Sequence, residues 1–582
     1  MKFAFLEPKA PGRHIFSRIQ LPRLGNVLLA TLLARRGHQC RVLIEEVRPI
    51  RPEDLEWADV VGISSTTSTA PAAYRWAAAA RRLGKRVVMG GPHVTFLPDE
   101  ALEHADFVVR GEGEETLLEL AEALEGEREP SGILGLSYLD AGGTRHNPSR
   151  PLLTDLDALP SPDFSFVEGW KPSRVLPLST SRGCPFACRF CSVVPMFGSR
   201  YRFQSVGRVL EDLGRYASST QHVFFCDDNF AARPRRAKEI CRGILDRGMK
   251  LEWSAQVRTD CANDPELLDL MARAGCWCVF LGLESINPRT LEAYDKRQSV
   301  DDIRRGVAAF RERRIRTHGM FVSGCDTDDR QTLRETVRFA REAAIDTVQF
   351  LNLTPAPGTP IFEEMERAGR IRTRDWSLYD AHHVVFEPVR FTPDELQNET
   401  QRASARFYSL RGAVRTLMRR DLFGFGLRLF AWQESRRNRL GKRPFLHGLR
   451  GELLRGAAKL KELLPTERVR SVALPTVGLS DDQKRFLLEF VRHKDERAQV
   501  KRLLAESLEN RLKCMSTTHF GLSSPVMNVS RLEAGARLAL ASVRAASRAL
   551  DITADAAIKK PKRREKETGV DFSLVDYTRG IS

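Results

Sequence analysis

Three cysteines on one short stretch of the chain are the residues best suited to chemistry. Cys184, Cys188 and Cys191 follow one another at C-x3-C-x2-C spacing, directly after the apolar run 175–180. Three thiolates on one loop can bind three irons of a [4Fe-4S] cube, a cluster that usually has four cysteine ligands. Such a loop leaves one iron open for another ligand. The alternative is structural zinc, but zinc needs four ligands and the next candidate, His222, lies far along the chain.

The cysteine spacing resembles that of the radical S-adenosylmethionine (SAM) enzymes. Phe190, the aromatic residue before the third cysteine, also matches the pattern of that family. The resemblance implies that SAM binds the open iron and that one electron from the cluster cleaves its sulfonium bond, which yields methionine and a 5′-deoxyadenosyl radical. It also implies an external electron donor of the flavodoxin or ferredoxin type. We therefore expect Cys184, Cys188 and Cys191 to hold the cluster and Phe190 to lie beside the cofactor.

The elements that must position this loop lie in the segment 171–390, which alternates predicted strands with helices. Strands are expected at 175–180, 222–227, 251–257, 278–283, 316–322 and 347–353. Six such units are consistent with the partial (β/α)6 barrel of the radical SAM family, a TIM-type barrel. Barrels of this type carry their chemistry at the C-terminal ends of the strands. The cysteine loop follows the first strand.

Polar residues lie on or after several of these strands, where the family binds SAM. An arginine suits a carboxylate bidentately, and carboxylates suit hydroxyls and cations. By resemblance we expect Arg258 to bind the SAM carboxylate, Glu284 to bind the ribose, and Asp227 or Asp228 to lie near the amino group or the substrate. The alternative for each residue is a salt bridge at the top of the barrel. Two further residues complete the predicted SAM site, Ser254 and Gly282.

The N-terminal segment also alternates strands with helices. Strands are predicted at 2–6, 40–44, 59–64, 86–91 and 106–110, and helices at 25–36, 71–83 and 114–124. This alternation predicts an α/β fold with a parallel, doubly wound, Rossmann-like sheet. Ligands in such sheets bind at the carboxyl ends of the strands.

Small and hydroxyl residues follow three of these strands, and they let a bulky ligand approach the backbone closely. The segments 90–95 and 110–116 resemble those of the cobalamin (B12)-binding domain that precedes many radical SAM enzymes. The D-x-H-x-x-G motif that supplies a cobalt ligand in other cobalamin proteins is absent, and His93 is interpreted as a turn residue. The alternatives are a domain that binds nothing or another nucleotide. The predicted cobalamin contacts are Ser64, Thr66, Gly90, Gly91, Gly111 and Glu112.

The 582 residues suffice for three to four domains. We predict a cobalamin-binding domain at 1–140, a linker at 141–170, the barrel at 171–390, a mostly helical basic region at 391–555 and a charged, disordered tail at 556–582. Eleven cysteines without a pairing framework suit a reducing cytoplasm. No secretory pattern and no uninterrupted apolar run of ~18 residues is found.

Basic charge is concentrated in the last third of the chain. Of 92 Lys and Arg, 38 lie in residues 401–582, against 19 of the 75 Asp and Glu, so the first 400 residues are about neutral. Predicted helices over 404–464 interleave apolar and basic residues. They can pack on the open side of the barrel, which we favour, or lie peripherally on an anionic membrane.

The leading hypothesis is a radical SAM enzyme that transfers a methyl group through cobalamin to an unactivated carbon of a metabolite or lipid-like substrate. A second hypothesis keeps the cofactors but leads to cyclisation, rearrangement or oxidation. A tRNA-modifying, methylthiotransferase-like enzyme would carry three further cluster cysteines in an N-terminal domain. Residues 1–183 contain only Cys40, so a nucleic-acid partner is disfavoured. A binding protein with a degenerate barrel conflicts with the intact cysteine triad.

Overall fold

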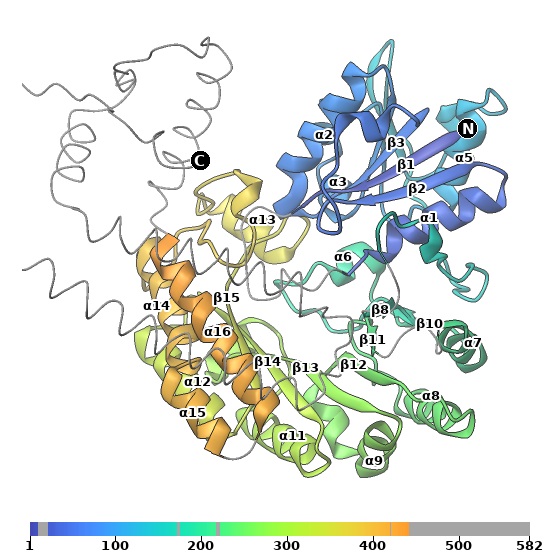
Figure 1. Cartoon of the computed structure of the whole chain (residues 1–582). Helices are drawn as coiled ribbons and strands as arrows, with labels where there is room; N and C mark the ends of the chain where they lie inside the picture. The colour runs from blue at the N-terminus through green and yellow to red at the C-terminus, as the bar shows by residue number, and fades with distance from the viewer. Residues whose placement is uncertain (10–20, 171–174, 217–221, 419–420, 442–582) are drawn as a thin grey trace, which may run out of the picture. The chain divides into compact units, whose positions relative to one another are not determined.

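The structure, a computed structural model (Figure 1), describes residues 1–9, 21–170, 175–216, 222–418 and 421–441. These residues form two largely parallel sheets, each accompanied by helices, and three C-terminal helices. The α/β fold class is therefore confirmed. The helices predicted beyond residue 441 and the tail at 556–582 lie outside the described residues.

The N-terminal sheet has seven strands in the order β2-β1-β3-β4-β5-β6-β7. The strands are β1 (Lys2–Glu7), β2 (Gln39–Ile44), β3 (Val60–Ser64), β4 (Arg86–Gly90), β5 (Phe107–Val109), β6 (Leu136–Asp140) and β7 (Gly143–His146). The main connecting helices are α1 (Leu24–Arg35), α2 (Ala70–Arg82) and α5 (Glu114–Leu124). Strands β1 to β5 are parallel, so the predicted doubly wound sheet is confirmed. In this order the chain reverses direction across the sheet between β1 and β3, and ligands bind at such a switch point.

Two details of this domain differ from the predictions. The hairpin β6–β7 pairs antiparallel onto β5 and continues the sheet, so the domain extends to His146 and does not end at 140. His93 does not lie in a turn, because a short helix, α3 (Pro92–Phe96), begins directly after β4. The first difference arises from pairing with β5, which is distant in sequence, whereas Pro92 at the first position of α3 is a local helix-start signal that the interpretation of His93 did not use.

The second sheet has six parallel strands in the order β8-β11-β12-β13-β14-β15. They are β8 (Leu176–Leu178), β11 (His222–Phe225), β12 (Glu252–Val257), β13 (Cys276–Glu284), β14 (Arg316–Ser323) and β15 (Thr347–Asn352). All six predicted barrel strands are thus confirmed. Strands β8 and β15 form opposite edges of the sheet, so among the described residues the barrel is open.

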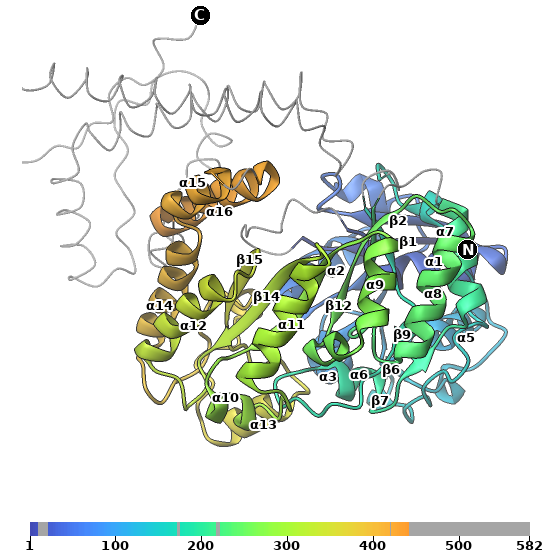
Figure 2. The ribbon, with the colours of Figure 1, turned by 90° about the horizontal axis from the view of Figure 1, so that it is seen from below.

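Helices cover one face of this second sheet. Figures 1 and 2 show α8 (Pro234–Asp246), α9 (Pro265–Arg273), α11 (Val300–Glu312) and α12 (Arg330–Glu342) along it. Side chains alternate between the two faces of a strand. Accordingly Val279 and Leu281 are fully buried under the helices, whereas Phe280 between them is only partly buried. The described residues therefore leave the inner face partly open.

Helix α13 (Pro360–Arg367) follows β15, and the described residues end with three further helices: α14 (Pro393–Phe407), α15 (Leu410–Met418) and α16 (Leu422–Gly441). Helix α14 contacts β15 and α12, and the Tyr408 hydroxyl donates to the carbonyl of Val348 at 2.7 Å. This part of the predicted helical region therefore packs against one edge of the barrel. Among the residues described, no helix combines the length and apolarity needed to cross a membrane.

Candidate active site

The three cysteines lie on a loop whose base is closed by a short antiparallel ribbon. We call residues 183–192 the cluster loop, and β9 (Ser181–Arg182) with β10 (Arg202–Phe203) the cluster ribbon. Gly183 has a φ of +83°, and a Cβ there would lie 2.3 Å from the carbonyl oxygen of Arg200. The Cys184 N–H donates to the carbonyl of Gly198 at 3.2 Å. Only glycine fits at the start of the loop, and the first cysteine is fixed directly after it.

The three thiols are partly buried, and none forms a disulfide. Burial raises the pKa of Cys188, and it raises the pKa of Cys191 to about 12. Thiols must lose their protons to bind metal, so cluster assembly on this loop releases protons.

The donor set fits a [4Fe-4S] cube better than a single metal ion. Among the described residues, no group of three or more His, Cys, Asp and Glu side chains is arranged around one ion. In a cube each thiolate binds a different iron, so the cysteines need not converge on one point. Three free thiols on one anchored loop match a cluster with one open iron, and Cys184, Cys188 and Cys191 remain its predicted ligands.

A group of buried charges lies beside the cluster loop. Arg258 follows β12, and its guanidinium lies 3.8 Å from the ring centroid of Phe186 in the loop. It donates to the carbonyls of Lys296 and Arg297 at 3.4 and 3.2 Å. Glu284 ends β13 in the left-handed backbone region, and its carboxylate accepts a hydrogen bond from the Lys296 amine at 2.8 Å. Arg258 and Glu284, which are predicted to bind the SAM carboxylate and ribose, thus lie next to the cluster loop.

The Glu284–Lys296 pair explains why Gly282 has no side chain. A Cβ at Gly282 would lie 2.7 Å from the Glu284 carboxylate and 2.9 Å from the Lys296 amine. Burial alone would lower the pKa of Lys296, but the charge and hydrogen bond of Glu284 hold that pKa above its usual value. Lys296 is therefore charged. Sequence reasoning missed this residue, because only the fold of the segment after β13 brings it to Glu284.

Phe190 packs at the other side of the loop. Its ring lies edge-to-face with that of Tyr294, with centroids 5.1 Å apart, and it joins an apolar cluster that includes Leu353 and Phe386. Phe190 therefore anchors the cluster loop, and whether it also touches a cofactor stays a prediction.

Sequence reasoning also missed Tyr201, whose hydroxyl lies 3.8 Å from the Cys184 sulfur.

Two residues predicted to contact SAM, Asp227 and Ser254, form hydrogen bonds within the protein. The buried Asp227 carboxylate accepts hydrogen bonds from Thr180 and from the N–H of Ser181, so it fixes the turn between β8 and β9. The Ser254 hydroxyl lies in the middle of β12, 3.0 Å from Nε2 of His222. These hydrogen bonds hold both side chains within the protein, and a SAM contact of Asp227 or Ser254 stays a prediction. Asp228, the next residue, lines the cavity described in the next paragraph. Burial and the charge of Asp227 raise the pKa of Asp228 to about 6.

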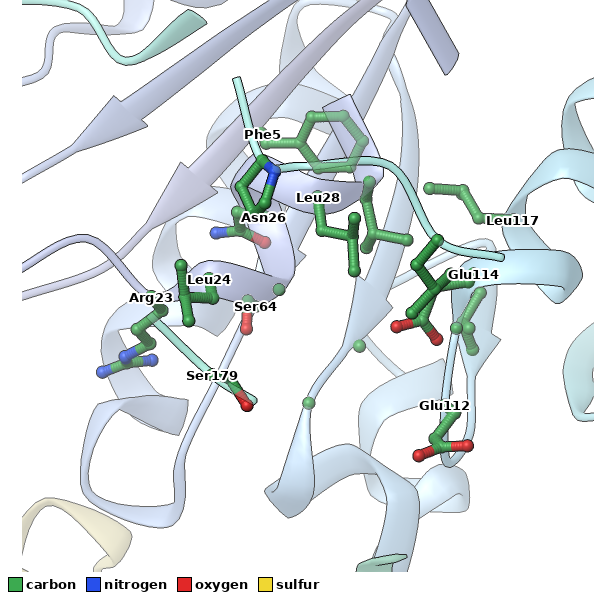
Figure 3. Close-up of a pocket in the computed structure, with 18 of the residues that line it drawn as sticks. Phe5, Arg23, Leu24, Asn26, Leu28, Ser64, Glu112, Glu114, Leu117 and Ser179 are labelled. Atoms are coloured by element: carbon green, nitrogen blue, oxygen red, sulfur yellow. The ribbon is translucent and has the colours of Figure 1, made fainter. Parts of the chain in front are cut away.

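The carboxyl end of the N-terminal sheet and the cluster ribbon enclose a cavity of about 540 Å³, which we call the cofactor cavity. Figure 3 shows Arg23 and Leu24 at one end and Glu112 and Glu114 at the other. Ser179 and Asp228 of the second sheet also line it. All six predicted cobalamin contacts lie in its wall, namely Ser64, Thr66, Gly90, Gly91, Gly111 and Glu112.

The cavity wall carries polar atoms that lack partners. Among the described residues, the buried amide nitrogen of Asn26 and the buried amide oxygen of Gln204 have no hydrogen-bond partner, and both residues line the cavity. Buried polar groups are rarely left unpaired, so these two indicate a polar ligand, and the amide groups on the rim of a corrin suit them. Nε2 of the buried His93 lies 3.1 Å from the Tyr74 hydroxyl, and His93 is not among the described residues that line the cavity.

The two glycines after β4 provide a matched pair of substitutions. Gly91 has a φ of +99°, and a Cβ there would lie 2.6 Å from the carbonyl oxygen of Ser65. At Gly90 a Cβ would meet only the carbonyl oxygen of Val109, at 3.6 Å. We expect Gly91→Ala to destabilise the N-terminal domain by about 1–3 kcal/mol and Gly90→Ala to cost clearly less. Thermal unfolding of the cofactor-free variants measures this, and equal losses would refute the steric argument.

Comparison with known proteins defines the class of this fold and site. Residues 18–121 match the family model described as B12 binding domain, and residues 178–340 match that of the Radical SAM superfamily. An uncharacterized methyltransferase of Pyrococcus horikoshii is 34% identical over 408 residues, which are 66% of this chain and 88% of the relative. The chain therefore belongs to the radical SAM enzymes that carry a B12-binding domain. The cofactors are a [4Fe-4S] cluster, SAM and cobalamin.

A second relative and a solved structure are also similar to this chain. The bacteriochlorophyllide d C-12(1)-methyltransferase of Chlorobaculum tepidum is 29% identical over 428 residues, which are 71% of this chain and 90% of that protein. The structure of the radical SAM methyltransferase TsrM from Kitasatospora setae, with cobalamin and a [4Fe-4S] cluster, superposes with a TM-score of 0.56 at 21% identity. The match covers 68% of this chain and 84% of that one, and it shows a shared fold.

Proposed function

We propose that this protein transfers a methyl group to an unactivated carbon of a small, largely apolar substrate. The observation that carries the proposal is the cofactor cavity, which is lined both by the carboxyl ends of the B12-type sheet and by the segment leading into the cluster loop. When bound, the cluster and SAM supply a hydrogen-abstracting radical, and cobalamin supplies the methyl group. The methyltransferase names of two relatives support the same reaction.

The chain's own residues hold and orient these reactants. The guanidinium of Arg258 is fixed by the Phe186 ring and by two backbone carbonyls, so it can bind a carboxylate without reorganisation. The Glu284 carboxylate is held in place by Lys296 and can accept hydrogen bonds from a ribose. Arg258, Glu284 and Lys296 are all less than 10% exposed, so water is largely excluded around them.

The inner face of the second sheet supports an apolar substrate. Phe280 pairs in register with Gln256 on one side, and Met320 pairs with Gln349 on the other. These four side chains and Phe224 are only partly buried by the described residues. Binding sites for small molecules commonly combine apolar and aromatic walls with a few polar groups. We infer a metabolite or lipid-like substrate with a large apolar body.

Product analysis tests the reaction. The reconstituted protein is incubated anaerobically with a strong reductant, a lipid extract of the source organism and SAM that carries a deuterated methyl group. We expect S-adenosylhomocysteine and 5′-deoxyadenosine to form together, and the label to enter a lipid product. 5′-Deoxyadenosine without S-adenosylhomocysteine or label would favour cyclisation, rearrangement or oxidation instead. Failure to cleave SAM at all would refute both functions.

Helix α15 suggests how an apolar substrate could be reached. Leu410, Val414, Leu417 and Met418 are 37–79% exposed, and their spacing places them on one face of the helix. The chain from residue 401 onward carries twice as many basic as acidic residues. We propose peripheral contact with anionic membranes through this face.

Liposome pelleting of the full-length protein tests the membrane contact. Met418→Glu is expected to reduce binding to phosphatidylglycerol vesicles at least fivefold, because it places a charge in the apolar face. Leu139→Glu is the control, since Leu139 is 49% exposed but lies in the hairpin of the first sheet. Wild-type binding should also weaken as salt rises. Equal binding by both variants, or no binding by the wild type at low salt, would refute this contact.

A further inference from the structure

The rim of the cofactor cavity is joined to the cluster loop by a group of buried charges. Glu112 and Glu114 follow β5 and line the cavity. Glu112 lies 3.0 Å and Glu114 lies 2.5 Å from the guanidinium of Arg182. Arg202 donates to both carboxylate oxygens of Glu112 at 2.8 Å. Two carboxylates of the B12-type domain are thus held by two arginines of the cluster ribbon.

These four side chains are largely withdrawn from solvent. Their exposed fractions are 6% for Glu112, 10% for Arg202, 12% for Glu114 and 18% for Arg182. Burial alone would raise the pKa of Glu112, but the hydrogen bond from Arg202 and the charge of Arg182 hold that pKa below its usual value. Glu112 is therefore charged, and removal of one of its arginine partners leaves this buried charge less compensated.

Arg182 is also the residue directly before the cluster loop. The next residue, Gly183, packs so closely that a Cβ would lie 2.3 Å from the carbonyl oxygen of Arg200. Cys184 follows, and its N–H is bound to the carbonyl of Gly198. This close packing leaves little room for Arg182 to move without moving the first cysteine.

We propose that Arg182 is a positioning residue that couples occupancy of the cofactor cavity to the geometry of the cluster loop. The inference rests on the assignment of cobalamin to this cavity in the proposed function. A corrinoid that contacts Gly111 and Gly113 fixes the loop that carries Glu112 and Glu114, and this loop fixes Arg182. By linkage, cobalamin and the cluster then raise the affinity for each other by the same factor. A chain without cobalamin holds its cluster more loosely, which favours radical formation in the fully loaded enzyme.

The test measures the dissociation constant of hydroxocobalamin by its absorbance, anaerobically, on the full-length protein. Each variant is measured with the cluster reconstituted and again after the iron is removed by a chelator. In the wild type we expect binding at least about fivefold tighter with the cluster, in the usual range of coupling between sites. Arg182→Gln should bring this ratio close to one. Glu114→Gln keeps the Glu112 contacts, so it should fold and show a reduced ratio.

Arg150 offers a matched control in the same domain. Its side chain is 11% exposed and pairs with Glu115 and Glu119 of α5 instead of with Glu112 or Glu114. Arg150→Gln therefore removes a comparably buried charge but should keep the wild-type ratio. A purely structural role of Arg182 would weaken cobalamin binding equally with and without the cluster and leave the ratio unchanged, which overturns the proposal.

Tight hydroxocobalamin binding by the wild type with a ratio of one overturns the coupling alone. Absence of binding in both states overturns the coupling together with the cofactor assignment on which it rests.

Discussion

Replacing Cys188 with alanine is expected to lower the iron content of the reconstituted protein from about four atoms per chain to well below one. The loop supplies three thiols, and two thiolates would leave two corners of the cube without protein ligands. SAM cleavage should fall below detection, because the cluster that would bind and reduce SAM is lost. Iron analysis and the brown colour of the anaerobic protein measure the loss.

Cys325→Ala is the matched control for this experiment. Cys325 is a partly buried free cysteine just after β14, and its sulfur accepts a hydrogen bond from the Thr327 hydroxyl at 3.4 Å. It lies outside the predicted ligand set, so its variant should retain about four irons. If Cys188→Ala kept its iron, or if Cys325→Ala lost it, the assignment of the three ligands would be wrong.

Much of the architecture could be predicted because it repeats a local pattern. Short apolar runs alternate with amphipathic helices along residues 1–390, and this alternation predicts both parallel sheets. The cysteine loop could be placed at the end of the first barrel strand, because its spacing and the preceding run are both local features. The predicted boundary at 140 divides a hairpin, because β6 joins the sheet by pairing with the distant β5 and β7 pairs in turn with β6.

The direction of individual side chains could not be predicted in the same way. Asp227 and Asp228 are adjacent in sequence, and only the structure shows that the first is enclosed by Thr180 and Ser181 while the second lines the cavity. Glu112 was expected to touch cobalamin, but its carboxylate is bound by Arg182 and Arg202. Ion pairs of this kind join segments far apart in sequence, so no local pattern marks them.

Breaking the Glu284–Lys296 pair is expected to damage the SAM site strongly. In Lys296→Met the Glu284 carboxylate stays buried without its main partner, a change that typically costs about 3–5 kcal/mol. Glu284 then takes up a proton or turns away from its place beside Gly282, and either change removes the predicted ribose acceptor. SAM affinity of the cluster-loaded protein, measured by equilibrium dialysis, should fall by roughly 10- to 100-fold.

A double variant distinguishes an effect on SAM affinity from an effect on thermal stability. Glu284→Gln with Lys296→Met removes both charges, so the thermal stability of the cofactor-free protein should recover towards that of the wild type. SAM affinity should stay low, because the carboxylate predicted to bind the ribose is absent. Lys238→Met is the control, since Lys238 pairs with Asp264 and Glu266 on the helical side of the barrel, and its variant should keep SAM affinity. If the double variant regained SAM affinity along with stability, Glu284 would serve the fold and not the cofactor.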